Sequence, residues 1–214
     1  MLLIGQYDSP FVRRVGIALH LYGIGFEHRP WSVFGDAEAI AAYNPLRRVP
    51  TLVLDDGEVL IETSAILDAL DQQVGAGRAL IAPAGPERRA AQKACALASG
   101  LADKAVALVY ERVLHARSTP LWTARCRAQI GDVLRVLEAE RAAGPGPWWF
   151  GEALGHADVA VACALRFVHE AHPGVFDADA HPALAAHAER CEALEPFRLV
   201  QQPFVVALPA AHEA

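Results

Sequence analysis

Short runs that suggest strands alternate with stretches of helical periodicity over the first 75 residues of the chain. Residues 2–6 form a short apolar run and residues 26–31 a second candidate strand, whereas residues 10–21 place apolar side chains near one face of a helix. Gly23 and Gly25 follow that helix, where glycine commonly ends one. The pattern predicts a strand–helix–strand unit whose two strands run parallel.

The following residues add a short helix, a hairpin and a further helix. Residues 37–43 are helical in pattern and stop before a proline, since the residue ahead of proline disfavours helix. Residues 50–54 and 59–61 are apolar runs around an acidic turn with glycine, which predicts a β-hairpin. Residues 63–74 are helical again. The order of elements predicts a mixed four-stranded sheet with three helices. Thioredoxin-like folds have this order, although the pattern alone leaves other α/β folds open.

The chain changes character near residue 80. Residues 75–86 are rich in Gly, Pro and Ala and indicate a linker, after which the whole pattern is helical, with long alanine-rich stretches. The predicted helices are residues 87–116, 120–143, 155–171 and 181–194. From Pro203 on we expect a loose tail. We therefore predict two domains, an α/β domain over residues 1–77 and an all-α domain over residues 86–202.

Composition excludes several classes of function. The formal net charge is −6 with 19 basic residues, so no nucleic-acid-binding footprint is present. No apolar run reaches the roughly 18 residues of a membrane span, and the apolar start is too short for a signal peptide, which together favour a cytoplasmic protein without membrane contact. The spacing of the cysteines and histidines fits neither a redox pair nor a zinc site, so no metal is expected. The cysteines are Cys95, Cys126, Cys163 and Cys191.

Three short segments carry a family resemblance. They are residues 7–15 (YDSPFVRRV), 44–52 (NPLRRVPTL) and 62–66 (ETSAI). In this order and spacing they resemble the glutathione-binding domain of glutathione transferases, and the Ser-Pro-Phe start is similar to tau-class plant enzymes and many bacterial members. The helical second half is similar to the family's C-terminal domain. The resemblance implies a thioredoxin-like domain followed by an all-α domain, glutathione as cosubstrate, and a homodimer.

Ser9 is the predicted catalytic residue. A serine before Pro10 is by itself a helix N-cap signal. The resemblance implies that the Ser9 hydroxyl also donates a hydrogen bond to the glutathione sulfur. Such a bond contributes about 1.5–3 kcal/mol, which lowers a thiol pKa by about 1–2 units, enough to ionise much of it around pH 7. Tyr7 remains open as an alternative phenol donor, and the lack of a nearby cysteine argues against a mixed-disulfide mechanism.

The resemblance also implies how glutathione is held. A cis bond before Pro50 would turn the Val49 backbone toward the cysteinyl part of the ligand. Glu62 would accept from the γ-glutamyl ammonium, and the Thr63 hydroxyl and N–H, at a helix start, would bind its α-carboxylate. Arg48 would pair with the glycyl carboxylate.

The remaining candidates are less specific. Aromatic and aliphatic residues at helical spacing suit either the core or a pocket for the electrophile. The pocket candidates are Phe11, Phe34 and Tyr110, with Val12 and Leu114. Asp103 could reach glutathione across a dimer or lie on a solvated helix face. Asp158 should cap a helix by accepting from the Gly155 N–H.

We therefore expect a glutathione transferase that activates the thiol for attack on a small hydrophobic electrophile. Peroxidase activity and isomerisation of the maleylacetoacetate type use the same residues, although the Ser-Ser-Cys start typical of the latter is absent. A non-catalytic family member that binds a protein partner is the third alternative.

Overall fold

The computed structural model describes residues 1–205, which form two compact units. The first comprises Met1–Ala79 together with the segment from Pro196 on, and the second comprises Leu80–Glu195. Most of the predicted loose tail falls on residues 206–214, which lie outside the described residues.

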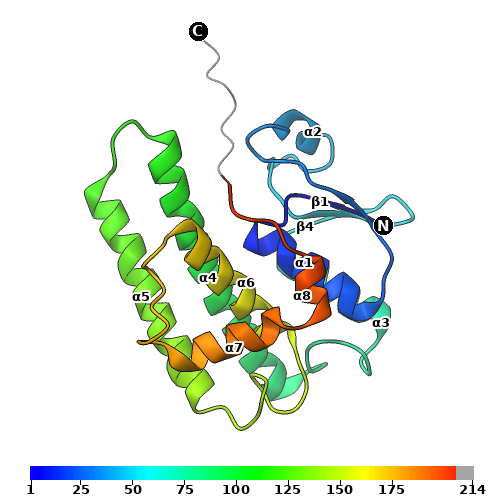
Figure 1. The fold of residues 1–214 in the computed structure, drawn as a ribbon. Helices are drawn as coiled ribbons and strands as arrows, with labels where there is room; N and C mark the ends of the chain where they lie inside the picture. Colours follow the sequence, from blue (N-terminus) through cyan, green and yellow to red (C-terminus); the bar gives the residue numbers. More distant parts are fainter. Residues whose placement is uncertain (206–214) are drawn as a thin grey trace. The chain divides into compact units, whose positions relative to one another are not determined.

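The first unit contains a mixed sheet with strand order β2-β1-β3-β4. Its strands are β1 (Leu2–Ile4), β2 (Glu27–Arg29), β3 (Thr51–Val53) and β4 (Val59–Ile61). Strand β1 runs parallel to β2 and antiparallel to β3, and β3 runs antiparallel to β4. The helices are α1 (Pro10–Tyr22), α2 (Ala37–Ala41) and α3 (Thr63–Val74) (Figure 1). The predicted thioredoxin-like order is confirmed.

Helix α1 begins and ends where its sequence indicates. Ser9 has an extended backbone, and its side chain accepts a hydrogen bond from the Val12 N–H, while Pro10 occupies the first helical position. Gly23 ends the helix with φ of 65°, a left-handed conformation that costs a glycine little. Val15 and Leu19 on its inner face are fully buried. The capping residues therefore determine where α1 begins and ends, and the spacing of its apolar residues determines which face is buried.

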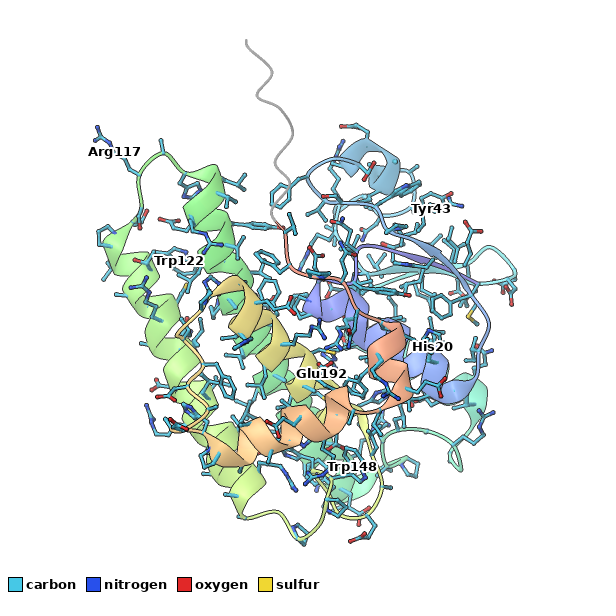
Figure 2. All side chains as sticks on the ribbon, viewed as in Figure 1. His20, Tyr43, Arg117, Trp122, Trp148 and Glu192 are labelled. Carbon is cyan, nitrogen blue, oxygen red and sulfur yellow. The ribbon has the colours of Figure 1, made fainter. Side chains whose placement is uncertain are left out.

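The second unit is helical throughout its regular structure. Its helices are α4 (Gly85–Leu114), α5 (Pro120–Ala142), α6 (His156–Ala171) and α7 (Pro182–Glu192). The short α8 (Glu195–Leu199) follows and belongs, from Pro196 on, to the first unit. Helix α4 packs against both α5 and α6. At the turn between α4 and α5, Arg117 extends outward, whereas Trp122 of α5 lies toward α4 (Figure 2), with the Lys104 Nζ atom 5.5 Å from the centre of its ring. None of the helices in residues 1–205 is long and apolar enough to cross a membrane.

The predicted cap of α6 is present. Asp158 accepts hydrogen bonds from the Gly155 N–H at 2.8 Å and from the Trp149 N–H at 2.7 Å. The second bond ties the loop before α6 to the helix start. Asp158 is 1% exposed, and burial raises the pKa of its carboxyl.

His187 of α7 lies beside this cap. It is fully buried, with its Nε2 atom 3.4 Å from the Asp158 carbonyl oxygen and 3.6 Å from the Cys191 sulfur. Its Nδ1 atom has no hydrogen-bond partner among the described residues. Burial lowers the pKa of His187 from 6.5 to about 4, with Arg141 and Arg190 adding to the effect.

This histidine should make stability depend on pH. Between pH 6.5 and about 4 the unfolded chain binds a proton at His187 that the folded chain does not. As far as His187 is concerned, the free energy of unfolding is therefore highest above pH 6.5 and decreases as the pH falls. The expected loss is about 2 kcal/mol by pH 5. The raised pKa of Asp158 acts in the opposite direction, which offsets part of the loss.

We expect His187→Gln to flatten the fall in the thermal midpoint between pH 7.5 and pH 5. The matched control is His169→Gln, because His169 is exposed on α6. Equal slopes for the wild type and both variants in thermal unfolding followed by circular dichroism would contradict the assignment.

Candidate functional site

The three segments of the predicted site leave the sheet at one edge. Thr51 pairs with Ile4 on one side and with Ile61 on the other. Because all three residues end or begin their strands, the turn after β1, the loop before β3 and the start of α3 all meet there. Residues separated by more than 50 positions in the sequence are thus brought together by strand register.

Gly5 sets the distance between two of these segments. It has φ of 129°, and a Cβ atom there would lie 2.5 Å from Val12 Cγ2 and 2.7 Å from Val49 Cβ. Real side chains do not approach this closely, so only glycine permits the contact. The first turn of α1 and the loop that carries Val49 therefore pack against the same backbone position.

Ser9 lies at the N-terminus of α1, as predicted. Its Oγ atom accepts from the Val12 N–H at 3.4 Å, and its own N–H donates to the Gln6 carbonyl oxygen at 3.2 Å across a turn. A hydroxyl that accepts one hydrogen bond still has its proton to donate. The start of the helix also favours a negative charge.

The Tyr7 ring lies away from Ser9. The ring stacks on His28 with centroids 3.8 Å apart, and a Cβ at Gly16 would lie 3.5 Å from its Cζ atom. Gly16 is about 10 Å along α1 from Ser9. Burial raises the pKa of Tyr7 to about 12. The phenol is therefore turned toward the middle of the helix, which favours Ser9 as the donor.

The bond between Val49 and Pro50 is cis, which confirms the prediction. Val49 is half-buried, and its backbone N–H and C=O have no hydrogen-bond partner among residues 1–205. A backbone segment with unpaired N–H and C=O groups beside a strand can accept a peptide as a short ladder.

Asn44 holds this loop, and sequence analysis did not single it out. The residue is 2% exposed. Its Nδ2 atom donates to the Arg48 carbonyl oxygen at 2.9 Å and to Thr51 Oγ1 at 3.2 Å, and its Oδ1 atom accepts from the Leu46 N–H at 3.0 Å. One buried amide thus fixes both ends of the segment that includes Val49. Asn before Pro45 was the only local signal, and it indicated a helix stop.

The start of α3 forms the third part. Glu62 adopts φ of 68°, which non-glycine residues rarely do outside functional sites. It is the N-cap residue but makes no side-chain capping bond. The N–H groups of the first turn, beginning with the buried Thr63, therefore form an anion-binding position.

Arg48 lies against Glu62. Their charged atoms are 3.4 Å apart, and both side chains are more than half exposed. An exposed pair of this kind contributes little to stability. Arg48 is therefore able to exchange this partner for a ligand carboxylate.

The pocket candidates differ in exposure. Val12 is fully buried and packs toward Gly5, so it belongs to the core. Phe11 is half-buried in α1, and Phe34 is half-buried in the loop before α2. Tyr110 and Leu114, both on α4 in the second unit, are 39% and 52% exposed. Asp103 is also exposed on α4. Among the described residues, no cluster of three or more His, Cys, Asp or Glu side chains is arranged to hold a metal ion.

Family models match both halves of the chain. The model of the glutathione S-transferase N-terminal domain matches residues 3–78, and that of the C-terminal domain matches residues 120–190. The chain belongs to the glutathione S-transferase family, which confirms the resemblance noted in the sequence.

Individual relatives agree with this assignment. The uncharacterised GST-like protein YibF of Escherichia coli K12 is 31% identical over 171 residues, which cover 79% of this chain and 82% of the relative. A probable glutathione S-transferase of Oryza sativa subsp. indica is 29% identical over 204 residues, covering 89% and 84%. The crystal structure of a glutathione S-transferase from Methylobacterium radiotolerans, in complex with glutathione sulfonate, superposes with a TM-score of 0.88 at 28% identity over 98% and 97% of the two chains.

Replacing Asn44 should damage both the loop and the ligand site. Asn44→Ala removes the buried partner of the Arg48 carbonyl and the Leu46 N–H, so we expect a loss of about 2–3 kcal/mol in the free energy of unfolding. Weaker retention on immobilised glutathione should accompany it. Gln73→Ala, an exposed amide on α3, is the control for denaturant unfolding. If Asn44→Ala matched that control in both measurements, the loop would not depend on Asn44.

Proposed function

We propose that this protein activates the thiol of glutathione at Ser9 and transfers the tripeptide to a small hydrophobic electrophile. The observation that carries the proposal is the register at the sheet edge, where Thr51 pairs with both Ile4 and Ile61. It brings a serine at a helix start, an unpaired backbone segment and a second helix start to one place.

The chemical step would begin at Ser9. The hydroxyl donates to the sulfur while its oxygen accepts from the Val12 N–H, so the two hydrogen bonds do not compete. With its pKa lowered in this way, the thiol loses its proton to solvent, and the thiolate is the nucleophile. It forms a carbon–sulfur bond with the electrophile, and the leaving group departs with the electron pair of the bond that breaks.

The tripeptide would be held by the other two segments. The Val49 N–H and C=O would pair with the cysteinyl backbone. The start of α3, with the Thr63 hydroxyl, would bind the γ-glutamyl α-carboxylate, and Glu62 would accept from its ammonium group. In support of this division, the structure leaves these groups without competing capping bonds from Glu62.

Arg48 has a different partner in the structure from the one in the proposed complex. It pairs with Glu62 at 3.4 Å, yet its proposed partner is the glycyl carboxylate at the other end of the tripeptide. Binding would therefore separate the pair, with the ligand's ammonium replacing Arg48 at Glu62. Because both side chains are largely exposed, this exchange costs little.

The other features complete the proposal. Phe11 and Phe34 are the proposed contacts of the electrophile in the first unit, Tyr110 on α4 stays a separate candidate, and no metal is required. We propose a cytoplasmic homodimer that takes part in detoxification, with domains at residues 1–77 and 86–202.

The alternative activities can be separated by the substrate offered. Peroxide or a cis-configured diacid in place of an aryl halide would distinguish peroxidase and isomerase activity from conjugation. Retention on immobilised glutathione would exclude a regulator that binds only protein.

Removing the Ser9 hydroxyl should raise the pKa of bound glutathione. For Ser9→Ala we expect a rise of about 1–2 units, and hence a fall of about 10–100-fold in kcat/KM near pH 6.5. The ultraviolet absorbance of the thiolate, titrated with glutathione saturating, measures the pKa, and 1-chloro-2,4-dinitrobenzene serves as the electrophile.

Two further variants separate chemistry from helix capping. Ser118→Ala, in the exposed loop after α4, should behave as the wild type. Ser9→Asp keeps a capping oxygen but offers no donor, so it should fold normally and still raise the thiol pKa. A wild-type thiol pKa in Ser9→Ala would show that Ser9 does not activate the thiol.

Changing Glu62 should affect binding rather than turnover. Glu62→Gln removes the charge that faces the ammonium, so KM for glutathione should rise about tenfold with kcat nearly constant. Glu58→Gln in the exposed hairpin is the control for steady-state kinetics with varied glutathione. An unchanged KM would place the ammonium elsewhere.

A further inference from the structure

The chain after α8 lies against α1 and is anchored there by Arg13. Arg13 is 2% exposed. Its Nε atom donates to the Val200 carbonyl oxygen at 2.8 Å and its Nη2 atom to that of Phe197 at 3.1 Å, while its Cζ atom lies 5.6 Å from the centre of the Phe197 ring. These contacts satisfy carbonyls at the end of a helix, where cations are favoured. Figure 1 shows this C-terminal segment running beside α1.

Gly16 permits this close approach. A Cβ atom there would lie 3.0 Å from Val200 Cγ1 and 3.0 Å from Tyr7 Cε1. The Val200 side chain and the Tyr7 ring therefore both lie against one point on the surface of α1. The C-terminal segment is thus in reach of the turn that precedes α1.

Gln202 makes the direct contact with that turn. Its side-chain oxygen accepts a hydrogen bond from the Tyr7 N–H at 3.1 Å. Tyr7 is the first central residue of the turn closed by the Ser9 N–H and the Gln6 carbonyl. Its ring is stacked on His28. Tyr7 is therefore held through its backbone by Gln202 and through its side chain by His28.

We propose that Gln202 is a positioning residue for thiol activation, acting by holding the turn that presents Ser9. This inference rests on the proposed role of Ser9 and adds a residue from the far end of the chain. Among residues 1–205, the Ser9 hydroxyl has only a long hydrogen bond of 3.4 Å, from the Val12 N–H, to fix its direction. The orientation of the preceding turn therefore sets where the hydroxyl proton points, and small misplacements of a reacting group are costly.

The adjacent glutamines Gln201 and Gln202 provide a matched pair of positions for the test. Gln202→Met keeps the length of the side chain and removes the acceptor, while Gln201→Met makes the same change at an exposed neighbour. For Gln202→Met we expect the pKa of bound glutathione to rise by about 0.5 unit, and kcat/KM below that pKa to fall about threefold. KM for glutathione should stay within about twofold, because the proposed ligand contacts at Val49 and Glu62 do not involve the turn.

Amide hydrogen exchange at Tyr7 checks the contact itself. Exchange should accelerate in Gln202→Met and not in Gln201→Met. Gln202→Glu retains an oxygen of similar reach and should restore slow exchange. Slow Tyr7 exchange in Gln202→Met would overturn the contact, and fast exchange with an unchanged thiol pKa would overturn the positioning role.

Ser9→Ala measured in parallel separates this inference from the proposed function. If Ser9→Ala raises the thiol pKa and Gln202→Met does not, only the role of Gln202 fails. If neither variant changes it, Ser9 activation fails and the role of Gln202 fails with it.

Discussion

The pairing of Thr51 with Ile4 and Ile61 is the constraint on which the candidate site depends. A slip of one residue in the pairing of a strand moves its buried side chains to the other face of the sheet. Leu52, next to Thr51, is fully buried, and so is Leu3 opposite it. Core packing thus fixes the register, and the register fixes which loops meet at the edge.

Gly5 allows two of the loops that meet at this edge to come into contact. With any other residue at this position, the first turn of α1 and the loop with Val49 could lie near one another, but a Cβ atom would keep them apart. With no Cβ, the first turn of α1 and the cis-proline loop approach the same backbone atom. Asn44 then fixes the loop from its other side through the Arg48 carbonyl. The site is therefore built by buried groups that have no proposed contact with the ligand.

The sequence predicted the elements well and the supporting contacts poorly. Periodicity, caps and turn residues are local, so α1, α3 and the hairpin were predicted close to their observed bounds. The cis bond and the three ligand segments came from the family resemblance. Gly5, Asn44 and Gln202 were missed because each acts through a partner that only the folded chain brings near. For Gln202 that partner, Tyr7, is 195 positions away.

Val12 shows a choice that the sequence left open. Its helical position suited a pocket as well as the core, and periodicity cannot distinguish the two. The structure buries it fully, because the side chain fills the space beside Gly5. The missing information was again a contact between separate segments. Apolar pattern therefore predicts which face of a helix is inward, but not which inward residues a ligand can reach.

Charge explains why such a site would work in an acidic protein. The chain carries a net charge of −6, whereas glutathione brings two carboxylates, an ammonium and, once ionised, a thiolate. Long-range repulsion is screened beyond about 10 Å at ordinary ionic strength, so local groups decide binding. The N-terminal ends of α1 and α3 supply partial positive charge at the same sheet edge, and Arg48 adds a full one. Only Glu62 is negative among the proposed contacts, and in the proposed complex it would face the ligand's single cation. The sheet register thus concentrates the favourable ends of two helices where the proposed ligand is most negative.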